Sequence, residues 1–444
     1  MSSGKRKKKP DYTAYEDREQ LCPHFEKCGG CTMQKVSYEK QLEIKTAEVM
    51  NLLGISDAAD ESIENNPTVF EGILPSPLQE GYRNKMEFTF GDEFKDGPFA
   101  LGLHMRGSFM NIVNITDCRL VHNDINIIRN AVRDFFAPLY ESDCINFRNN
   151  RTGKGYLRHL LIRKAWSTGQ ILAALVTTSQ YHFHDKNPGS GEGSIHDSQP
   201  DASACVNDTY GEDRLMADLV NVLTSLQLDG EITGILHIIN DSTSDVVKSD
   251  RTDVLYGRDY IMEKILGLEF KISPFSFFQT NSSGAEVLYS KVREYACLGD
   301  GTLFDLYSGT GTIAQIMSSS VGNVIGVEIV AEAVDAAREN AKRNGIANVK
   351  FIAEDVLKAL DELPTPDYII LDPPREGVNP KALGKILGYD VENIIYVSCK
   401  PSSLARDMAA FKLAGYAMTR VCCVDMFPQT GNVETIALMS KKSE

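Results

Sequence analysis

The sequence predicts an α/β protein whose C-terminal part is a doubly wound parallel sheet, and three observations lead to this fold class. From about residue 271 onward, apolar segments of strand length alternate with segments of helical spacing. A glycine-rich turn containing Gly309 and Gly311 follows the first of these strands. Residues before 270 have a different texture, with short alternating strands and few helices. Alternating strands and helices form a parallel sheet that binds ligands outside the carboxyl ends of its strands.

Apolar runs bounded by turn residues define the expected elements of this C-terminal sheet. A helix is expected over Ala331–Asn344, ended by Gly345, because glycine favours the left-handed conformation that terminates helices. The expected strands are Thr302–Leu306, Val324–Val327, Val349–Ile352, Tyr368–Leu371, Asn393–Val397, Tyr416–Asp425 and Glu434–Met439. If the last of these strands is antiparallel, its first residue lies at the carboxyl edge of the parallel strands.

Composition shifts divide the chain into four expected parts. Residues 1–20 form a basic disordered tail, and residues 21–64 hold a cysteine segment and a helix over Tyr38–Leu53 that stops at Gly54. Residues 65–270 form a strand-rich α+β domain with a mobile insertion at 181–214, because this stretch is polar and rich in Gly, Ser and Asp. Residues 271–444 form the doubly wound domain. A chain of 444 residues is too long for one ordinary core.

The bulk composition is that of a globular protein in a reducing compartment. No stretch approaches the ~18 consecutive apolar residues of a membrane helix, and the N-terminus carries Lys5–Lys9 instead of an apolar signal segment. A cytoplasmic location without membrane contact is therefore expected. The net charge of −15 argues weakly against nucleic-acid binding, although a local basic surface can exist on an acidic protein.

The glycine turn and the strand ends predict a nucleotide-type cofactor site. Gly309 and Gly311, with Glu328 at the end of the second strand, fit either NAD or S-adenosylmethionine. Asp355 after the third strand can reach an adenine edge, and Asp372 after the fourth is followed by two stiffening prolines. Such a loop is common in S-adenosylmethionine enzymes that act on nucleobases, so this cofactor is favoured over NAD.

A thiol and a carboxylate are expected at the same edge of the sheet. Cys399 follows the last parallel strand and precedes a helix that begins near Pro401. A helix N-terminus can lower the pKa of a thiol from about 8.5 into the range ~3.5–7.5, which favours the thiolate. Glu434 begins the final strand. This pair suits methyl transfer to carbon 5 of a pyrimidine, because a thiolate activates the ring at carbon 6 and a base then removes the carbon 5 proton.

Several motifs carry a family resemblance that covers nearly the whole chain after residue 20. They are Gly81–Lys85, Leu157–His159, Phe277–Asn281, Asp305–Thr312, Asp372–Arg375, Ser398–Pro401 and Val433–Thr435. Together they resemble the RNA (uracil-5-)-methyltransferase family, which implies a class I methyltransferase sheet. The resemblance implies Cys399 as nucleophile and Glu434 as proton acceptor. It implies a cofactor site lined by Gln279, Tyr307, Gly309, Gly311, Thr312, Glu328, Asp355 and Asp372.

Three residues depart from the usual family pattern. Lys400 and Thr312 stand where asparagine is usual, and Asn432 stands where histidine is common. The RNA-binding barrel (TRAM) of many members is expected to be absent, because the cysteines begin at residue 22.

Ten cysteines in a reducing compartment do not suggest a disulfide framework. Cys22, Cys28 and Cys31 are clustered, and Gly29 and Gly30 between the last two let the backbone wrap closely around a metal. Three cysteines alone do not choose between zinc and an iron–sulfur cluster. The branch that this pattern resembles, the 23S rRNA enzymes, binds a [4Fe–4S] cluster with a distant fourth cysteine, which by position is Cys118.

Zinc and four unligated thiols remain the alternatives to the cluster. The other cysteines are interpreted as packing or incidental thiols, namely Cys144, Cys205, Cys297, Cys422 and Cys423.

These observations predict an enzyme that makes 5-methyluridine in RNA with S-adenosylmethionine as donor. The cluster favours 23S rRNA as substrate, and the uridine is expected single-stranded or flipped out, because carbon 6 is shielded within a stack. The alternatives are a tRNA uracil-5-methyltransferase, a non-catalytic iron–sulfur RNA-binding protein and an NAD-dependent oxidoreductase. No obligate protein partner is expected.

Overall fold

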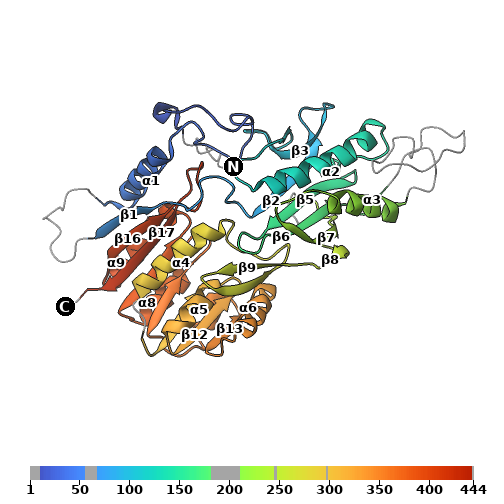
Figure 1. The fold of residues 1–444 in the computed structure, drawn as a ribbon. Helices are drawn as coiled ribbons and strands as arrows, with labels where there is room; N and C mark the ends of the chain where they lie inside the picture. Colours follow the sequence, from blue (N-terminus) through green and yellow to red (C-terminus); the bar gives the residue numbers. More distant parts are fainter. Residues whose placement is uncertain (1–10, 56–67, 182–210, 245–247, 297–298, 443–444) are drawn as a thin grey trace, which may run out of the picture.

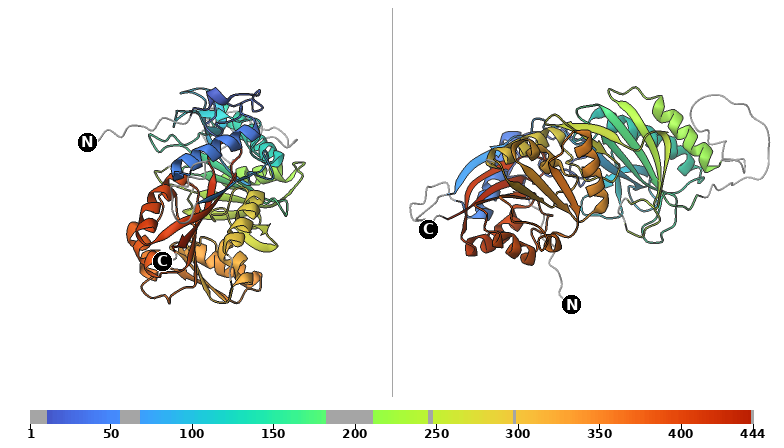
Figure 2. Two further views of the ribbon diagram at one scale, coloured as in Figure 1. Left: turned by 90° about the vertical axis from the view of Figure 1, so that its left-hand side faces the viewer. Right: turned by 90° about the horizontal axis from the view of Figure 1, so that it is seen from below.

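The computed structural model describes residues 11–55, 68–181, 211–244, 248–296 and 299–442. They form an eight-stranded sheet, a seven-stranded sheet and a two-stranded hairpin (Figure 1). The two large sheets lie side by side along the molecule (Figure 2). Residues 1–10 of the predicted basic tail and residues 182–210 of the predicted insertion lie outside the described residues. The expected disorder is wrong for residues 11–20 of that tail, because Tyr12 is buried and Arg18 donates to Gln429 at 2.9 Å, which fixes this stretch on the C-terminal part. Within the described ranges, no helix is both long and apolar enough to cross a membrane.

The C-terminal part forms the predicted doubly wound sheet. Its strand order is β1-β16-β17-β15-β14-β11-β12-β13. The strands are β1 (Val69–Leu74), β11 (Thr302–Leu306), β12 (Asn323–Glu328), β13 (Val349–Ala353), β14 (Tyr368–Leu371), β15 (Asn393–Ser398), β16 (Tyr416–Val424) and β17 (Glu434–Lys441). All neighbours pair in parallel except β17, which is antiparallel to both β15 and β16. The predicted antiparallel last strand is therefore confirmed.

Helices cover both faces of this sheet, because parallel strands bury apolar side chains on each face. One face carries α4 (Ser282–Ala296), α5 (Thr312–Met317) and α6 (Ala331–Arg343), and the short η3 (Ser318–Ser320) follows α5. The other carries α7 (Val356–Ala359), α8 (Pro380–Gly388) and α9 (Pro401–Leu413). Helix α6 ends one residue before the predicted Asn344, and Gly345 follows with φ 66°.

The N-terminal segment packs on the C-terminal sheet. It contains η1 (Thr13–Tyr15) and α1 (Tyr38–Leu53), which contacts α9 and stops at Gly54 as predicted. The Nζ of Lys45 in α1 lies 2.6 Å from Oδ1 of Asp425, and neither side chain is exposed. Removing one partner of such a buried pair typically costs ~3–5 kcal/mol, so this contact holds α1 firmly on the end of β16.

The expected strand-rich part does not include β1, although its residues fall within 65–270. This strand instead extends the eight-stranded sheet beside β16. Its Glu71 accepts from Arg420 of β16 at 2.5 Å and lies 2.7 Å from Lys291 of α4. These ion pairs and the ladder with β16 attach it to the C-terminal sheet (Figure 1, red strands).

The central part forms a mostly antiparallel sheet of order β4-β3-β2-β5-β6-β7-β8, flanked by α2 and α3. Its elements are β2 (Lys85–Asp92), β3 (Phe99–His104), β4 (Ile112–Asn114), α2 (Asn123–Glu141), β5 (Leu157–Lys164), β6 (Gln170–Thr177), α3 (Glu212–Thr224), β7 (Glu231–Ile239) and β8 (Arg251–Gly257). Residues 212–214 of the predicted insertion are the first turn of α3. The Tyr156 hydroxyl donates to Glu212 at 2.6 Å, and Leu215 of the same helix is fully buried, which ties this turn to the sheet.

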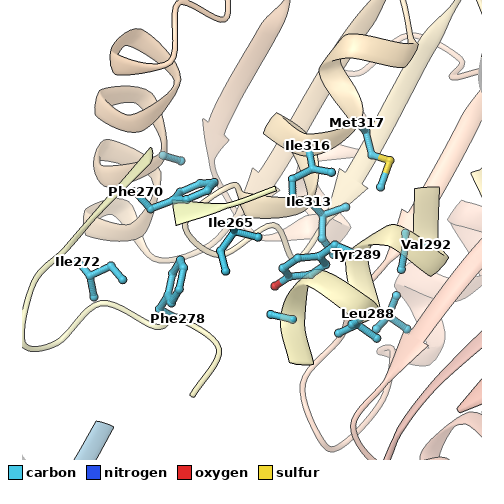
Figure 3. Packing of buried hydrophobic residues seen from close by; sticks show 14 of the residues in the cluster. Ile265, Phe270, Ile272, Phe278, Leu288, Tyr289, Val292, Ile313, Ile316 and Met317 are labelled. Carbon is cyan, nitrogen blue, oxygen red and sulfur yellow. The ribbon is translucent and has the colours of Figure 1, made fainter. Parts of the chain in front are cut away.

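A hairpin of β9 (Ile261–Ile265) and β10 (Leu268–Ile272) connects the cores of the two sheets. Leu266 and Gly267 form its two-residue turn, and both have the positive φ that a type I′ turn requires (47° and 84°). Phe270 of β10 lies in one buried cluster with Leu288 of α4 and Ile313 of α5 (Figure 3). The same cluster includes apolar residues of β6 and β7, so the two sheets share a continuous core.

One prediction about the cysteines is wrong. Cys144 was interpreted as an incidental thiol, but it is disulfide-bonded. Its partner is none of the free cysteines within the described ranges. The sequence pattern gave no indication of this bond, because disulfide pairing depends on which segments the fold brings together.

Candidate functional site

The loop after β11 has the tight backbone that the glycines predict. Tyr307, Gly309 and Gly311 all have positive φ (69°, 53° and 73°). A Cβ at Gly311 would lie 2.5 Å from the ring of Phe351, so only glycine fits there. At Gly309 a Cβ would meet only the Phe277 ring, at 3.9 Å, which leaves room for a ligand against the loop backbone. Helix α5 begins at the buried Thr312.

Two acidic residues at neighbouring strand ends flank this loop. Glu328 ends β12, and its carboxylate accepts from the backbone N–H of Gly309 at 3.0 Å and of Val330 at 2.9 Å. Asp355 follows β13 and caps α7 by accepting from the N–H of Leu357 at 2.9 Å. Burial and the nearby Asp355 carboxylate raise the pKa of Tyr307 to about 12. Tyr307, Glu328 and Asp355 thus gather along the carboxyl edge of the sheet, as predicted.

Gln279 lies in the segment between β10 and α4. Its carbonyl accepts from Nδ2 of Asn84 at 2.9 Å. Its side chain bonds the hydroxyl of Tyr289 on α4, whose pKa is raised by burial and by the carboxylates of Asp372, Glu434 and Asp305. Gln279 is therefore linked through Tyr289 to the residues at the ends of β11, β14 and β17.

The register of the last strand brings the predicted nucleophile and base together. Ser398 of β15 pairs with Thr435 of β17, so Cys399, one residue further along, comes level with Glu434. On the other side, Glu434 pairs with Val424 at the end of β16. Asp372 follows β14, the neighbour of β15, and its N–H donates to Leu306 at 3.3 Å. The expected convergence of Cys399, Asp372 and Glu434 is thus the geometry observed.

Three carboxyl groups share this edge, and each has a raised pKa. Burial raises the pKa of Glu434 to about 8, with the Asp372 charge adding to the rise and Arg375 opposing it. Burial raises the pKa of Asp372 to about 7. Burial, with the charges of Asp372 and Glu328, also raises the pKa of Asp305 to about 7. Buried like charges disfavour ionisation, so near neutral pH this crevice holds a mixture of acids and carboxylates.

The expected low pKa of Cys399 is wrong for the structure as it stands. Burial raises the pKa of this thiol, and the nearby Glu434 and Asp372 raise it further. The Arg375 guanidinium opposes the rise by its charge and by donating to the sulfur. Desolvation and two neighbouring acids therefore outweigh the start of α9, and Arg375 is the cation that can favour the thiolate.

Sequence analysis did not assign roles to Asp305, Tyr289 or Arg375. Asp305 is a fully buried acid within an apolar strand and accepts from Ala314 at 2.9 Å, which fixes the start of α5. A charged residue inside a buried strand was the signal that could have found it. Arg375 stands in the quoted Asp372–Arg375 motif, whereas Tyr289 has no local signal. Two of the departures from the family pattern, Lys400 and Asn432, are exposed.

The four predicted metal-binding cysteines converge on one mostly apolar cavity. Cys22, Cys28, Cys31 and Cys118 all line it, with Leu103 and Ile115 among the other lining residues. Burial raises the pKa of Cys31 to about 12 and of Cys118 to about 11, and it also raises the pKa values of Cys22 and Cys28.

Hydrogen-bond donors nevertheless surround these sulfurs. The N–H of Gly30 donates to Cys28 at 3.3 Å, the Gln34 amide donates to Cys31 at 3.6 Å, and backbone N–H groups also donate to Cys22 and Cys118. Buried thiols surrounded by donors fit binding to a cation, which would compensate for their loss of solvation.

The spacing of the sulfurs bears on which group they fit. No three of these four described sulfurs lie within 4.8 Å of one another. Four sulfurs around a zinc ion at about 2.3 Å would lie roughly 3.8 Å apart. The sulfurs are therefore spaced more widely than the four ligands of a tetrahedral zinc ion.

The raised pKa of Glu434 predicts a pH-dependent stability. Its proton stabilises the folded protein fully below about 4.5, and this stabilisation is lost as pH rises to about 8. The Glu434→Gln variant mimics the protonated acid. Its free energy of unfolding should exceed that of the native protein by a gap that widens by roughly 2–3 kcal/mol between about pH 6 and 8. Urea denaturation at these values measures the gap. Glu392→Gln, an exposed change beside β15, should show none, and a constant gap for Glu434→Gln would contradict the buried-acid assignment.

Comparison with known proteins identifies the family. Residues 239–442 match the model of the tRNA (uracil-5-)-methyltransferase family. An RNA methyltransferase of Clostridium acetobutylicum is 45% identical over 429 residues, covering 95% of this chain and 84% of that protein. One from Bacteroides thetaiotaomicron is 36% identical over 440 residues, covering 94% of this chain and 87% of that protein.

A solved structure supports the same assignment. The Pyrococcus abyssi tRNA (uracil-54, C5)-methyltransferase, in complex with S-adenosyl-L-homocysteine, is 26% identical with a TM-score of 0.67, covering 93% of this chain and 86% of that one. The sheet order with its antiparallel β17, the glycine loop and these similarities agree: the chain belongs to the RNA (uracil-5-)-methyltransferase family and is an RNA methyltransferase.

Proposed function

We propose that this enzyme transfers a methyl group from S-adenosylmethionine to carbon 5 of a uridine in RNA, with Cys399 as nucleophile and Glu434 as base. The observation that carries the proposal is the pairing of β15 with β17, which brings these two side chains level. Asp372 and Tyr289 lie at the same edge, and the exposed Arg375 donates to the Cys399 sulfur. A thiol beside an acid with a near-neutral pKa is what addition, methylation and elimination at a pyrimidine require.

The cofactor site in this proposal is the carboxyl edge around the glycine loop. Bound S-adenosylmethionine supplies a methyl group on a sulfonium, which is an electrophile. Glu328 has the position to accept ribose hydroxyls, and the space against Gly309 admits the ligand close to the backbone. The residues that would hold it are Gln279, Tyr307, Gly309, Gly311, Thr312, Glu328, Asp355 and Asp372.

The proposed reaction balances as three steps at the uracil ring. The Cys399 thiolate forms a bond to carbon 6, and the electrons of the ring double bond move to carbon 5 and its neighbouring carbonyl. Carbon 5 then forms a bond to the methyl group. The electron pair of the broken carbon–sulfur bond stays on the donor sulfur. Glu434 takes the carbon 5 proton, and the freed electron pair restores the double bond and expels Cys399 as thiolate. Arg375 favours the thiolate form of Cys399, both before it adds to carbon 6 and when it is expelled.

This mechanism predicts opposite outcomes for its two key residues. Cys399→Ala should abolish methyl transfer, because nothing then activates carbon 5. Glu434→Gln should still methylate the ring but accumulate a covalent enzyme–RNA adduct that survives denaturing gel electrophoresis, because the proton cannot be removed. Cys423→Ala, a change of a buried thiol in β16, should do neither. Native turnover by the Cys399→Ala protein would refute the mechanism.

Large-subunit 23S rRNA is the proposed substrate, and the four-cysteine site is the feature that favours it. The similarity to the Pyrococcus tRNA enzyme, at 26% identity, keeps tRNA as the alternative. In either case the uridine must leave its stack to expose carbon 6 to Cys399.

The choice of RNA can be measured directly. In a deletion strain, one 5-methyluridine or more should disappear from 23S rRNA while tRNA keeps its full content, as nucleoside mass spectrometry would show. Loss from tRNA alone would favour the alternative substrate. Reintroducing the native gene, but not the Cys399→Ala version, should restore the modification.

A [4Fe–4S] cluster is the proposed occupant of the four-cysteine site. The spacing of the sulfurs and the donors around them support it over zinc. Cys22, Cys28, Cys31 and Cys118 would be the ligands. The cluster has a structural role in this proposal, because thiolate-assisted methyl transfer involves no electron.

Metal analysis separates cluster from zinc. Protein purified without oxygen should contain iron and acid-labile sulfide and should show broad visible absorption. Cys118→Ser should lose most of the iron, whereas Cys423→Ala, which lies in β16, should keep it. Stoichiometric zinc in place of iron would contradict the cluster.

A further inference from the structure

The loop between β16 and β17, residues 425–433, leads directly into Glu434, and its centre is held by the N-terminal segment. Gln429 lies at that centre and is only 1% exposed. Its φ is 68°, in the left-handed region that few residues other than glycine occupy. The left-handed conformation is unfavourable for a non-glycine residue, so the surrounding contacts must fix it.

Five hydrogen bonds from residues 18–41 supply this fixation. The Gln429 carbonyl accepts from the N–H groups of Thr32 at 2.9 Å and Met33 at 3.1 Å. Its N–H donates to Oε1 of Gln41 at 2.8 Å. Its side-chain Oε1 accepts from Gln41 at 3.1 Å and from Arg18 at 2.9 Å. Both the backbone and the side chain of Gln429 are therefore bound by a segment that lies 388 to 411 positions earlier in the chain.

The loop residues before Gln429 are also held by other segments. The Tyr82 hydroxyl donates to the carbonyl of Pro428, and the Asn281 amide donates to the carbonyl of Met426, both at 3.0 Å. Lys45 pairs with Asp425 and donates to the carbonyl of Phe427 at 3.2 Å. Residues 425–429 of the loop are thus held by other segments, and the hydrogen bonds at Gln429 come entirely from the N-terminal segment.

We infer that Gln429 is a positioning residue for Glu434, and that residues 18–41 act through it to hold the base at its working position. The inference rests on the proposed function, because it concerns the step in which Glu434 removes the carbon 5 proton. A displacement of about 1 Å at a reacting group can cost ~100-fold in rate, so a loop that sets the start of β17 bears directly on this step. Thr32 follows Cys31 directly, so a group that holds Cys31 also holds one of the two donors to the Gln429 carbonyl.

The test is the Gln429→Asn variant. Asparagine tolerates the left-handed conformation, but its side chain is one methylene shorter and cannot keep the bonds to both Gln41 and Arg18. We expect release of tritium from RNA labelled at carbon 5 to slow by about 10–100-fold, whereas transfer of labelled methyl into the covalent adduct slows less than about threefold. The adduct should therefore accumulate, as in Glu434→Gln.

Two further variants make the readout specific. Arg18→Met removes one of the five bonds at a half-buried position and should shift the balance toward adduct in the same direction but by less. Lys40→Met is the matched control, because Lys40 precedes Gln41 on α1 but, among the described residues, forms its ion pair with Glu43 at the surface. It should leave both rates unchanged.

The outcomes separate this inference from the proposed function. If Glu434→Gln traps an adduct but Gln429→Asn and Arg18→Met do not, the positioning role is overturned and the mechanism stands. If Gln429→Asn and Arg18→Met lose methyl transfer and tritium release in equal proportion, with a lower thermal melting temperature, the contact is merely structural and the inference is again overturned. If Glu434→Gln traps nothing, both proposals fall.

Discussion

The insertion of an antiparallel strand between two parallel neighbours is the constraint on which the rest of the structure depends. Parallel strands bring only their carboxyl ends to the ligand edge, so every parallel strand contributes residues that follow it. Strand β17 runs the other way and contributes its first residue, Glu434. A one-residue slip would turn every side chain of β17 to the opposite face and move the Glu434 carboxyl away from the Cys399 thiol. Its pairing with β15 and β16 on both sides makes such a slip costly.

The crevice built by this pairing balances burial against ionisation. The pKa values of Glu434, Asp372 and Asp305 are raised to about 7 to 8. The charge of Arg375 opposes the rise for Glu434 and for the Cys399 thiol. Burial makes Cys399 a weak acid when the site is free, but it also makes Glu434 a far better proton acceptor than an exposed glutamate. Ordinary solvation would leave Glu434 too weakly basic for its proposed step.

Local pattern was enough to predict most of the C-terminal fold and the position of its site. The strands, the ends of α1 and α6, and the convergence at the sheet edge follow from apolar runs, glycines and strand direction. What sequence reasoning missed depends on distant segments. Lys45 and Asp425 are 380 positions apart, and no periodicity marks either as a buried ion pair. Sequence reasoning also missed that β1 belongs to the eight-stranded sheet, because its partner β16 is similarly distant in the chain.

The thiol pKa was misjudged for a different reason. A helix start is visible in sequence, whereas the burial of Cys399 and the two acids facing it become visible only in three dimensions.

The N-terminal segment explains how a cysteine site can matter to a reaction that transfers no electron. Between residues 11 and 37, the single turn η1 is the one regular element, so hydrogen bonds within secondary structure contribute little order there. This irregular segment nevertheless supplies Arg18, Thr32 and Met33 to the loop before Glu434. A segment with little secondary structure needs contacts with other parts of the protein to hold its hydrogen-bond donors in place. Four sulfurs bound to one group, with Cys118 attached to the central part, would supply them. The cysteine site and the catalytic edge are thus connected through the continuous path from Cys31 to Gln429 to Glu434.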